Sequence, residues 1–324
     1  DDGNVMGSFS SRGPNLTAPD ILKPDVTAPG VNILAGQTPD VANGVRNENF
    51  QYLTGTSMSV PHVAGIAALI REAHPDWTPA AIKSALMTTS RQNVTKGDGT
   101  TPADPFDFGA GHIVPNGAID PGLVFEAVKE DYDAFMCGTK EPRVTAEECQ
   151  QLADAGYPTT AVELNLPSIA VSLLVAEQTI RRRVTNVGPA GQYTAQVSAP
   201  PGIDVEVTPS VLSLGTGEVG TFDVTLSTSS ADLYEWQFGS LSWNDPTHVV
   251  HTPIAVRPVP FLAPAESIAS GRSGSLQFDV QFGMLELKLG NERAAIRLLQ
   301  SGYRRAHELY ANQTIAKSTL LEAL

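Results

Sequence analysis

The sequence lacks the features that would place it in a membrane or on nucleic acid. No run in its 324 residues approaches the roughly 20 uninterrupted apolar residues that a bilayer core requires. Positive charge is also scarce, because 21 Lys and Arg face 35 Asp and Glu and leave a net charge of −14. A surface that follows a phosphate backbone is therefore not expected. These shortages exclude a transmembrane protein and argue against a nucleic-acid partner.

Cysteine is the next shortage, since Cys137 and Cys149 are the only two in the chain. Neither has the nearby Cys or His neighbours that a zinc site requires, so no metal site is expected from them. A single disulfide and two free thiols stay open as alternatives, because sequence alone does not give the distance between the two side chains. A disulfide would favour an oxidising compartment.

The composition that is present indicates a globular protein. Hydrophobic residues make up 41% and charged residues 17% of the chain, enough for a sizeable core and about two domains. The sequence begins at Asp1 without a basic and apolar leader, so we expect any targeting signal to lie outside it. We interpret the chain as part of a longer protein.

The character of the sequence changes twice along the chain. Residues 1–135 alternate short apolar runs with helical stretches, which predicts an α/β domain whose strands are covered by helices. Residues 136–159 are interpreted as a linker. Residues 259–324 contain a Ser/Gly-rich stretch, a predicted strand at 276–282 and a predicted helical tail of unknown role over 284–324.

Between residues 160 and 258 the helical period disappears. Short runs rich in Val, Thr and aromatic residues recur there between Gly/Pro turns, which predicts an all-β sandwich. The predicted strands cover residues 180–184, 192–197, 204–207, 220–226, 239–243 and 249–256.

The stretch from Gly55 to Gly65 carries the strongest chemical signal. Gly55 permits a tight turn, and Ser57 then stands where an apolar helix begins, beside backbone N–H groups at the positive end of the helix dipole. A nucleophilic serine whose own N–H stabilises an oxyanion needs this arrangement. The alternative is a helix cap without chemistry, which Gly-Thr-Ser alone would favour. Small residues further along, including Ala64 and Ala68, predict a closely packed, buried helix.

The full eleven residues, Gly-Thr-Ser-Met-Ser-Val-Pro-His-Val-Ala-Gly, resemble the serine motif of the subtilisin-like proteases (subtilases) at every specified position. Flanking segments are similar to the plant cucumisin-like branch, and the resemblance covers about residues 5–258. These segments are Phe9–Asn15, Leu22–Leu34, His74–Thr89, Gly109–His112 and Asp120–Val124. The resemblance implies part of a subtilisin-like domain, with a parallel sheet and covering helices, followed by a fibronectin-III-like sandwich over 160–258.

The resemblance implies a serine endopeptidase in which Ser57 is the nucleophile, its N–H helps form the oxyanion hole, and Gly55 and Thr56 form the active-site turn. In this arrangement the Asp and His of the triad precede the serine in the chain. The 56 residues before Ser57 contain no histidine, and neither Asn4 nor Asn15 lies in a segment like that of the oxyanion Asn. We therefore expect residues 1–324 alone to have little or no peptidase activity.

No other histidine is expected to replace the missing base. His62 lies five residues beyond Ser57 on the same helix, so at about 100° per residue it points about 140° away from the hydroxyl. We interpret it as a helix histidine bonded to the backbone. The other five histidines are interpreted as structural or as part of the tail, and they are His74, His112, His248, His251 and His307.

Other signals are weaker. Five aspartates could suggest calcium, but they lack the close alternating spacing of a dedicated loop, so we expect no cofactor. They are Asp25, Asp98, Asp104, Asp107 and Asp120. The expected partner is a polypeptide substrate, the oligomeric state stays open, and the resemblance implies extracellular action. Two rival interpretations are a non-catalytic module whose sandwich binds a partner and a pseudoprotease.

Overall fold

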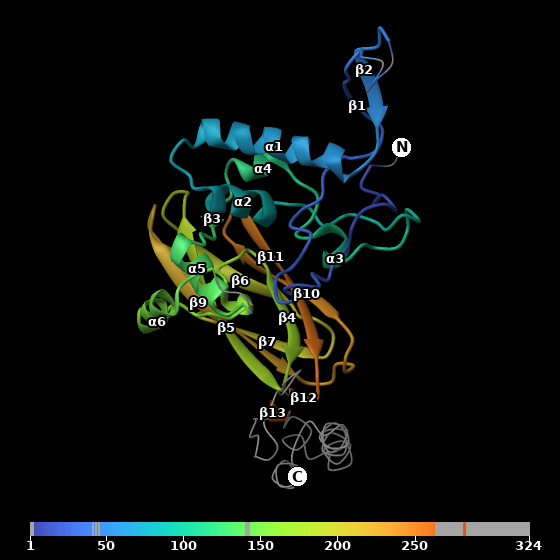
Figure 1. Ribbon diagram of the computed structural model, residues 1–324. Coiled ribbons are helices and arrows are strands. Elements are labelled where there is room, and N and C mark those ends of the chain that lie inside the picture. Colours follow the sequence, from blue (N-terminus) through green and yellow to red (C-terminus); the bar gives the residue numbers. More distant parts are fainter. Residues whose placement is uncertain are drawn as a thin grey trace.

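A computed structural model describes residues 3–262 and 281–282, apart from residues 41, 43, 45 and 140–142 (Figure 1). The helical tail predicted for 284–324, and all but the end of the strand predicted for 276–282, lie outside the described residues. Within the described residues, no helix has the length and apolar character needed to cross a bilayer.

The second half of the described chain is a sandwich of two sheets (Figure 1). One sheet has the strand order β4-β11-β10-β6-β8, and the other has the order β3-β5-β9-β7. The strands are β3 Leu123–Val124, β4 Ile169–Leu174, β5 Glu177–Asn186, β6 Gly191–Ser198, β7 Ile203–Thr208, β8 Val211–Leu214, β9 Val219–Thr228, β10 Gln237–Asn244 and β11 Val249–Pro258. All six strands predicted from the sequence are confirmed, and β3, β4 and β8 are additional.

The sandwich forms because its strands alternate buried and exposed side chains. In β9, every second residue from Gly220 to Thr228 is buried, so one face of the strand contributes to the core. Trp243 and Phe222 meet edge to face at the centre of this core, with ring centroids 4.9 Å apart. A short antiparallel pair, β12 Phe261–Leu262 and β13 Gln281–Phe282, follows the sandwich.

Helices are the main regular structure in the first part of the chain. Its helices are α1 Thr56–Ala73, α2 Pro79–Thr88, α3 Pro105–Phe108, α4 Pro115–Ala118 and α5 Lys129–Cys137. The start of α2 follows from sequence, because the Thr78 hydroxyl accepts the Ala81 N–H at 3.1 Å and Pro79 takes the first helical position. An antiparallel ribbon, β1 Ile33–Gly36 with β2 Phe50–Leu53, projects beside the N-terminal end of α1 (Figure 1).

Parallel pairing in this first part consists, among the described residues, of two single bridges, Val5 with Thr95 and Thr27 with His112. A parallel sheet needs several neighbouring strands, and the described segments supply only these contacts.

Helix α1 also differs from its prediction, because the sequence predicted a buried central helix. Ile70 is its one buried residue, and Val60 and Leu69 are 64% and 57% exposed, because the described elements cover a single side of the helix.

The two parts share an extensive junction. Strand β3 comes from the first part but pairs with β5 of the sandwich. Phe106 of α3 packs edge to face against Trp236 and Phe238. In the segment interpreted as a linker, helix α6 Ala146–Asp154 is tied to α5 by a disulfide between Cys137 and Cys149. Of the two alternatives left open by the sequence, a disulfide or two free thiols, the structure contains the disulfide.

Candidate active site

Ser57 lies in the first turn of α1, one residue after the helix begins. Its side chain is exposed. The N-cap residue, Gly55, provides no side-chain cap, and the first turn contains no acidic residue. The first N–H groups of a helix have no partner within the helix, so the N–H of Ser57 is available to an incoming oxygen at the positive end of the helix dipole.

A segment from far upstream holds this turn in place. The N–H of Gly55 donates to the carbonyl oxygen of Gly30 at 2.8 Å, and the Ser59 hydroxyl donates to that of Ala28 at 3.0 Å. A Cβ atom on Gly30 would overlap Ser59 Oγ and lie 2.8 Å from the carbonyl oxygen of Gly55. The segment therefore reaches the serine turn only because residue 30 has no side chain.

Gly55 begins a tight turn, in which its carbonyl oxygen accepts the Met58 N–H at 3.0 Å, but its own conformation does not require glycine. Its φ of 161° is an extended conformation, which any residue adopts. An added Cβ would meet only Met58 Sδ at 3.7 Å and the Ser57 nitrogen at 3.9 Å, both ordinary contact distances. The close approach that excludes a side chain is at Gly30.

None of the described histidines is placed to act as a base for Ser57. His62 turns back on its own helix, where Nδ1 lies 2.8 Å from the carbonyl oxygen of Met58. His74 lies past the other end of α1, about 25 Å from Ser57 at 1.5 Å per residue. His112 Nδ1 lies 3.0 Å from the Ile113 carbonyl oxygen, and His248 and His251 belong to the sandwich.

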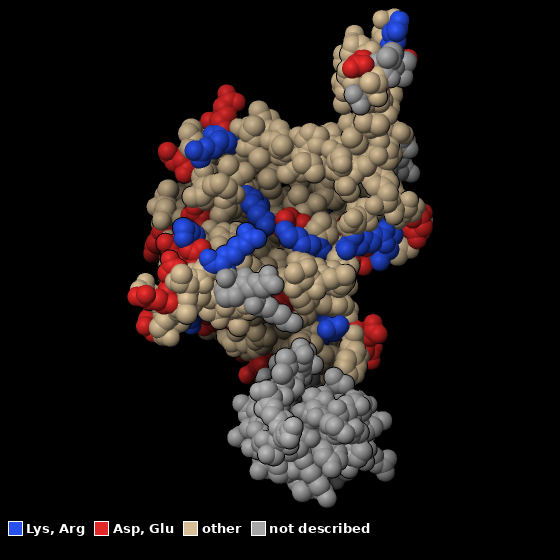
Figure 2. Space-filling model, viewed as in Figure 1, with Lys and Arg blue, Asp and Glu red and all other residues tan. Residues whose placement is uncertain are grey.

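The chain on either side of Ser57 contains a long run of residues without charged side chains. The sequence has no Asp, Glu, Lys or Arg from Phe50 to Ile70. In the space-filling view, the part of α1 that is visible is accordingly free of charged side chains until its C-terminal end (Figure 2). Exposed apolar side chains in this region include Phe50, Tyr52 and Val60. The surface around the serine thus combines exposed hydroxyl groups, that of Ser57 among them, with exposed apolar side chains and no charge from Phe50 to Ile70.

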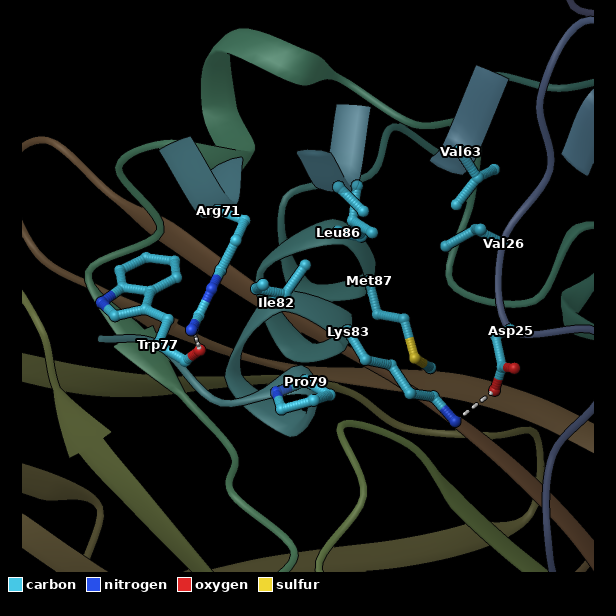
Figure 3. Close-up of a pocket in the computed structure, with 11 residues that line it drawn as sticks. Asp25, Val26, Val63, Arg71, Trp77, Pro79, Ile82, Lys83, Leu86 and Met87 are labelled. Carbon is cyan, nitrogen blue, oxygen red and sulfur yellow. Dashed lines mark hydrogen bonds and ion pairs between the residues drawn. The ribbon is translucent and has the colours of Figure 1, made fainter. Parts of the chain in front are cut away.

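A cavity of about 650 Å³ lies between α1 and α2 (Figure 3). Val63, Ala67 and Arg71, at successive i, i+4 positions of α1, form one wall, and Ser57 is not among the lining residues. At the edge, Asp25 contacts Lys83 at 3.0 Å and Lys23 at 2.6 Å. Burial opposes ionisation of Asp25, but the two lysines outweigh it and lower the pKa of this carboxyl group.

The five aspartates considered for calcium do not gather at one site. Asp25 pairs with lysines, Asp98 accepts the N–H groups of Thr100 and Thr101 in its own turn, and Asp120 faces His248. Asp104 and Asp107 form the capping box of α3 and contact Lys96 at 2.9 and 3.3 Å. In the part of the chain that the structure describes, no three His, Cys, Asp or Glu residues are grouped as a metal site would require.

Comparison with family models decides the identity of both parts. Residues 1–111 match the model of the subtilase family, and residues 163–256 match that of a fibronectin type-III domain. The chain belongs to the subtilase family. The predicted fold class, a subtilisin-like part followed by a fibronectin-III-like sandwich, is confirmed.

Curated relatives of the chain include plant proteins. The subtilisin-like proteases SBT3.11 and SBT5.4 of Arabidopsis thaliana are 41% and 40% identical to the chain, and each match covers 78% of this chain and 34% of the relative. The subtilisin-like protease Glyma18g48580 of Glycine max is 42% identical over the same shares. The chain thus spans about a third of the length of these relatives.

Proposed function

We propose that this subtilase chain carries the nucleophile of a serine endopeptidase, Ser57. The proposed general base, its orienting Asp and the oxyanion Asn come from residues outside 1–324. The observation that supports the proposal is the exposed hydroxyl of Ser57 at the uncapped N-terminus of α1, within an eleven-residue motif that matches the family at every specified position.

In the proposed reaction, Ser57 Oγ attacks the carbonyl carbon of a peptide bond and loses its proton to a histidine base. The carbonyl oxygen becomes an oxyanion beside the N–H of Ser57, where the helix dipole favours negative charge. Each donor of an oxyanion hole contributes about 3 kcal/mol to transition-state stabilisation. The base then protonates the leaving amine, which leaves an acyl group on Ser57 for water to hydrolyse. This chemistry needs no cofactor.

The segment containing Ala28 and Gly30 serves this reaction by positioning. Its two hydrogen bonds, to Ser59 and Gly55, lie on either side of Ser57 in the sequence. A donor contributes to catalysis only when it is already aimed at the developing oxyanion. The segment therefore fixes the direction of the Ser57 N–H before substrate arrives.

The proposed substrate is a polypeptide, and the proposed place of action is extracellular. The uncharged surface along Phe50 to Ile70 supports a substrate or protein contact better than a charged ligand. Without an activating base, a serine hydroxyl is a poor nucleophile at neutral pH. Residues 1–324 alone are accordingly proposed to be inactive.

A fluorophosphonate probe, which labels activated serines, tests the proposal. In the natural polypeptide that contains the upstream residues, we expect labelling at Ser57 and hydrolysis of a peptide substrate. Ser57→Ala should abolish both, while the matched control Ser8→Ala, at an exposed loop serine, should keep both. Residues 1–324 alone should show neither. Hydrolysis that survives Ser57→Ala would contradict the proposal.

A further inference from the structure

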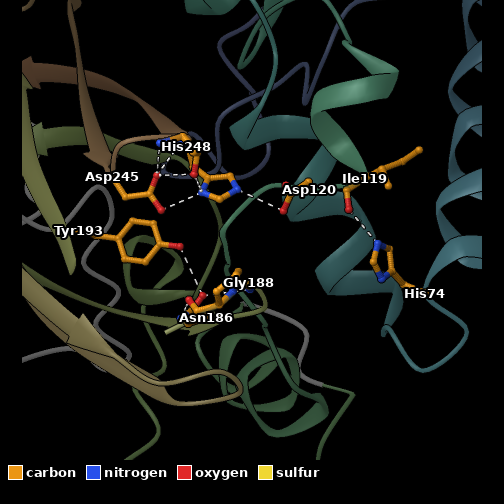
Figure 4. A network of polar contacts seen from close by, with 10 residues as sticks. His74, Ile119, Asp120, Asn186, Gly188, Tyr193, Asp245 and His248 are labelled. Atoms are coloured by element: carbon orange, nitrogen blue, oxygen red, sulfur yellow. Dashed lines mark hydrogen bonds and ion pairs between the residues drawn. The ribbon is translucent and has the colours of Figure 1, made fainter. Parts of the chain in front are cut away.

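His248 connects the sandwich to the first part of the chain (Figure 4). It lies in the connection between β10 and β11, and its ring stands between two aspartates. Asp245 belongs to the same connection, whereas Asp120 comes from the connection between α4 and β3. The three side chains therefore bring a loop of the sandwich together with a loop that follows the helices.

The contacts of His248 use both ring nitrogens. Nδ1 lies 2.8 Å from Asp245 Oδ2, in hydrogen-bond geometry. Nε2 lies 3.2 Å from Asp120 Oδ1, which is ion-pair distance when the ring is protonated, but this contact lacks the geometry of a hydrogen bond. Asp245 Oδ1 also accepts the backbone N–H groups of Thr247 and His248 at 2.7 and 2.6 Å, which fixes its carboxylate in the turn.

This geometry selects the charged form of the ring. A neutral imidazole has one N–H and would turn the lone pair of its other nitrogen toward a carboxylate. The imidazolium has an N–H on both sides and a positive charge between two negative ones. His248 and Asp245 are only 9% and 10% exposed, so water screens this pair weakly, while Asp120 is 72% exposed.

Two neutral groups also lie beside the ring, the Thr247 hydroxyl and, on the far side of Gly122, the phenol of Tyr193. The Thr247 hydroxyl lies 2.9 Å from Nδ1. Burial, together with the charge of Asp245, raises the pKa of Tyr193 to about 12, so this phenol stays protonated at ordinary pH. The charge state of the cluster near neutral pH therefore depends on His248.

Gly122 makes the close approach possible. Its φ of +74° lies in the left-handed region, and an added Cβ would be 2.9 Å from His248 Cγ and 3.0 Å from the Tyr193 hydroxyl. The carbonyl oxygen of Gly122 accepts the Val187 N–H at 2.9 Å, so a backbone hydrogen bond crosses the junction beside the ring.

The same loop also holds the end of the serine helix. The carbonyl oxygen of Ile119, next to Asp120, lies 2.8 Å from His74 Nε2 (Figure 4). His74 is the C-cap residue of α1, and its ring stacks on Trp77 with centroids 4.0 Å apart. A chain of contacts thus runs from His248 through the Asp120 loop to the C-terminal end of α1.

We propose that His248 is a protonation-dependent latch, which as an imidazolium holds the Ile119–Val124 loop, and with it the end of α1, against the sandwich. The proposal does not depend on the peptidase activity. It assigns to the sandwich a regulatory contact with the helix that carries Ser57.

The pH at which the latch opens follows from the pKa of His248. Burial alone would lower this pKa, but the contacts with Asp245 and Asp120 outweigh burial and raise it above the usual value of 6.5. A histidine with a raised pKa in the folded state stabilises that state fully below pH 6.5. The stabilisation is lost as the pH rises through the higher folded-state pKa. We therefore expect the junction to loosen on the alkaline side of neutrality.

Amide hydrogen exchange in the full chain tests the latch at two adjacent residues. The Val187 N–H crosses the junction to Gly122, whereas the Asn186 N–H donates to Glu218 at 3.0 Å within the sandwich. In the wild type, the protection of Val187 relative to Asn186 should fall about two- to fivefold as the pH rises through the His248 pKa, a size typical of a partly exposed ion pair. An NMR titration of the His248 ring supplies that pKa.

Asp120→Asn keeps the shape of the side chain and removes its charge. In this variant we expect a lower His248 pKa and a Val187 to Asn186 ratio that no longer changes over the same pH range. Asp204→Asn, at an exposed position of β7 outside the cluster, is the matched control and should behave as the wild type. A flat ratio in the wild type, or an unchanged pH dependence in Asp120→Asn, would overturn the latch.

Discussion

The hydroxyl of Ser59 donates a hydrogen bond of 3.0 Å to the carbonyl oxygen of Ala28, which lies 31 residues earlier in the chain. This contact and the neighbouring bond from Gly55 to Gly30 bind the serine turn to a segment that does not itself carry catalytic chemistry. The position of Ser57 therefore depends on how closely residues 28–30 can approach the start of α1.

Gly30→Ala should destabilise the chain by about 1 to 3 kcal/mol, the range measured for an extra carbon atom in a tightly packed site. The added Cβ would overlap Ser59 Oγ, and it would lie 2.8 Å from the backbone oxygen of Gly55, which cannot rotate away. Urea unfolding measures the change. Combining Gly30→Ala with Ser59→Ala should recover part of the loss, since one of the two clashes then disappears.

The matched control for this substitution is Gly65→Ala. Gly65 lies inside α1, it is exposed, and an added Cβ meets nothing within 4 Å. Alanine favours the helix interior over glycine by about 1 kcal/mol, so this variant should be as stable as the wild type or more stable. If both glycine variants lost the same stability, the close approach at Gly30 would not be the cause.

Arg182 and Arg181 are neighbours on β5 with opposite environments. The Arg182 side chain is 2% exposed, and its guanidinium donates to the carbonyl oxygens of Val162 and Ser168 at 2.8 and 3.2 Å. Burial lowers its pKa to about 10, so it remains charged at neutral pH. Arg182→Ala would leave these buried carbonyl groups without a partner and should cost about 2 to 4 kcal/mol of folding stability.

Arg181→Ala is the comparison for this variant. Arg181 is largely exposed and pairs with Asp223 at 2.8 Å, and ion pairs exposed to water contribute little to folding stability. Urea unfolding should therefore show a much lower free energy of unfolding for Arg182→Ala than for Arg181→Ala. An equal loss would mean that the buried carbonyl groups find other partners.

The sequence predicted six strands of the sandwich, including β9 with its regular alternation, but it missed β3, β4 and β8, the last of which alternates over only four residues. Strands β3 and β4 were not predicted from the sequence, and each has a physical reason. β4 is buried at almost every position and pairs in parallel with β11, so its sequence has no alternation to detect. β3 has only two residues. Helix α6, inside the segment interpreted as a linker, did leave a sequence signal, because Thr145 and Glu148 form a capping box at its start.

The candidate site was likewise predictable only in part. Ser57 stands in a local motif, which sequence alone reveals. The contributions of Gly30 and Ser59 arise from contact between two segments that are distant in the chain, and neither segment has a local pattern that indicates the other. The cluster around His248 was missed for the same reason, since Asp120 and Asp245 approach the ring from different parts of the fold.

The disulfide between Cys137 and Cys149 should stabilise the α5–α6 region. It closes a loop with a sequence separation of 12, for which the chain-entropy estimate is about 3 kcal/mol. In a Cys137→Ser, Cys149→Ser double variant, we expect faster amide exchange in α5 and α6 and unchanged exchange in β9 and β10. Uniformly faster exchange over the sandwich would show instead that the disulfide supports the whole fold.

Folding stability should depend on the titration of His251 with a sign opposite to that of His248. It lies on β11, and burial lowers its pKa to about 4, so the folded state holds the neutral ring. A lowered histidine pKa makes protonation favour the unfolded chain, and stability is lost as the pH falls from about 6.5 toward 4. At pH 4.5 the two pKa values correspond to a loss of about 2 to 3 kcal/mol relative to neutral pH. His251→Gln removes the titrating group, so urea unfolding of this variant at pH 7 and pH 4.5 should differ by that much less than in the wild type. Because carboxylates titrate equally in both proteins, an identical acid loss would mean that the ring of His251 is already solvated in the folded chain.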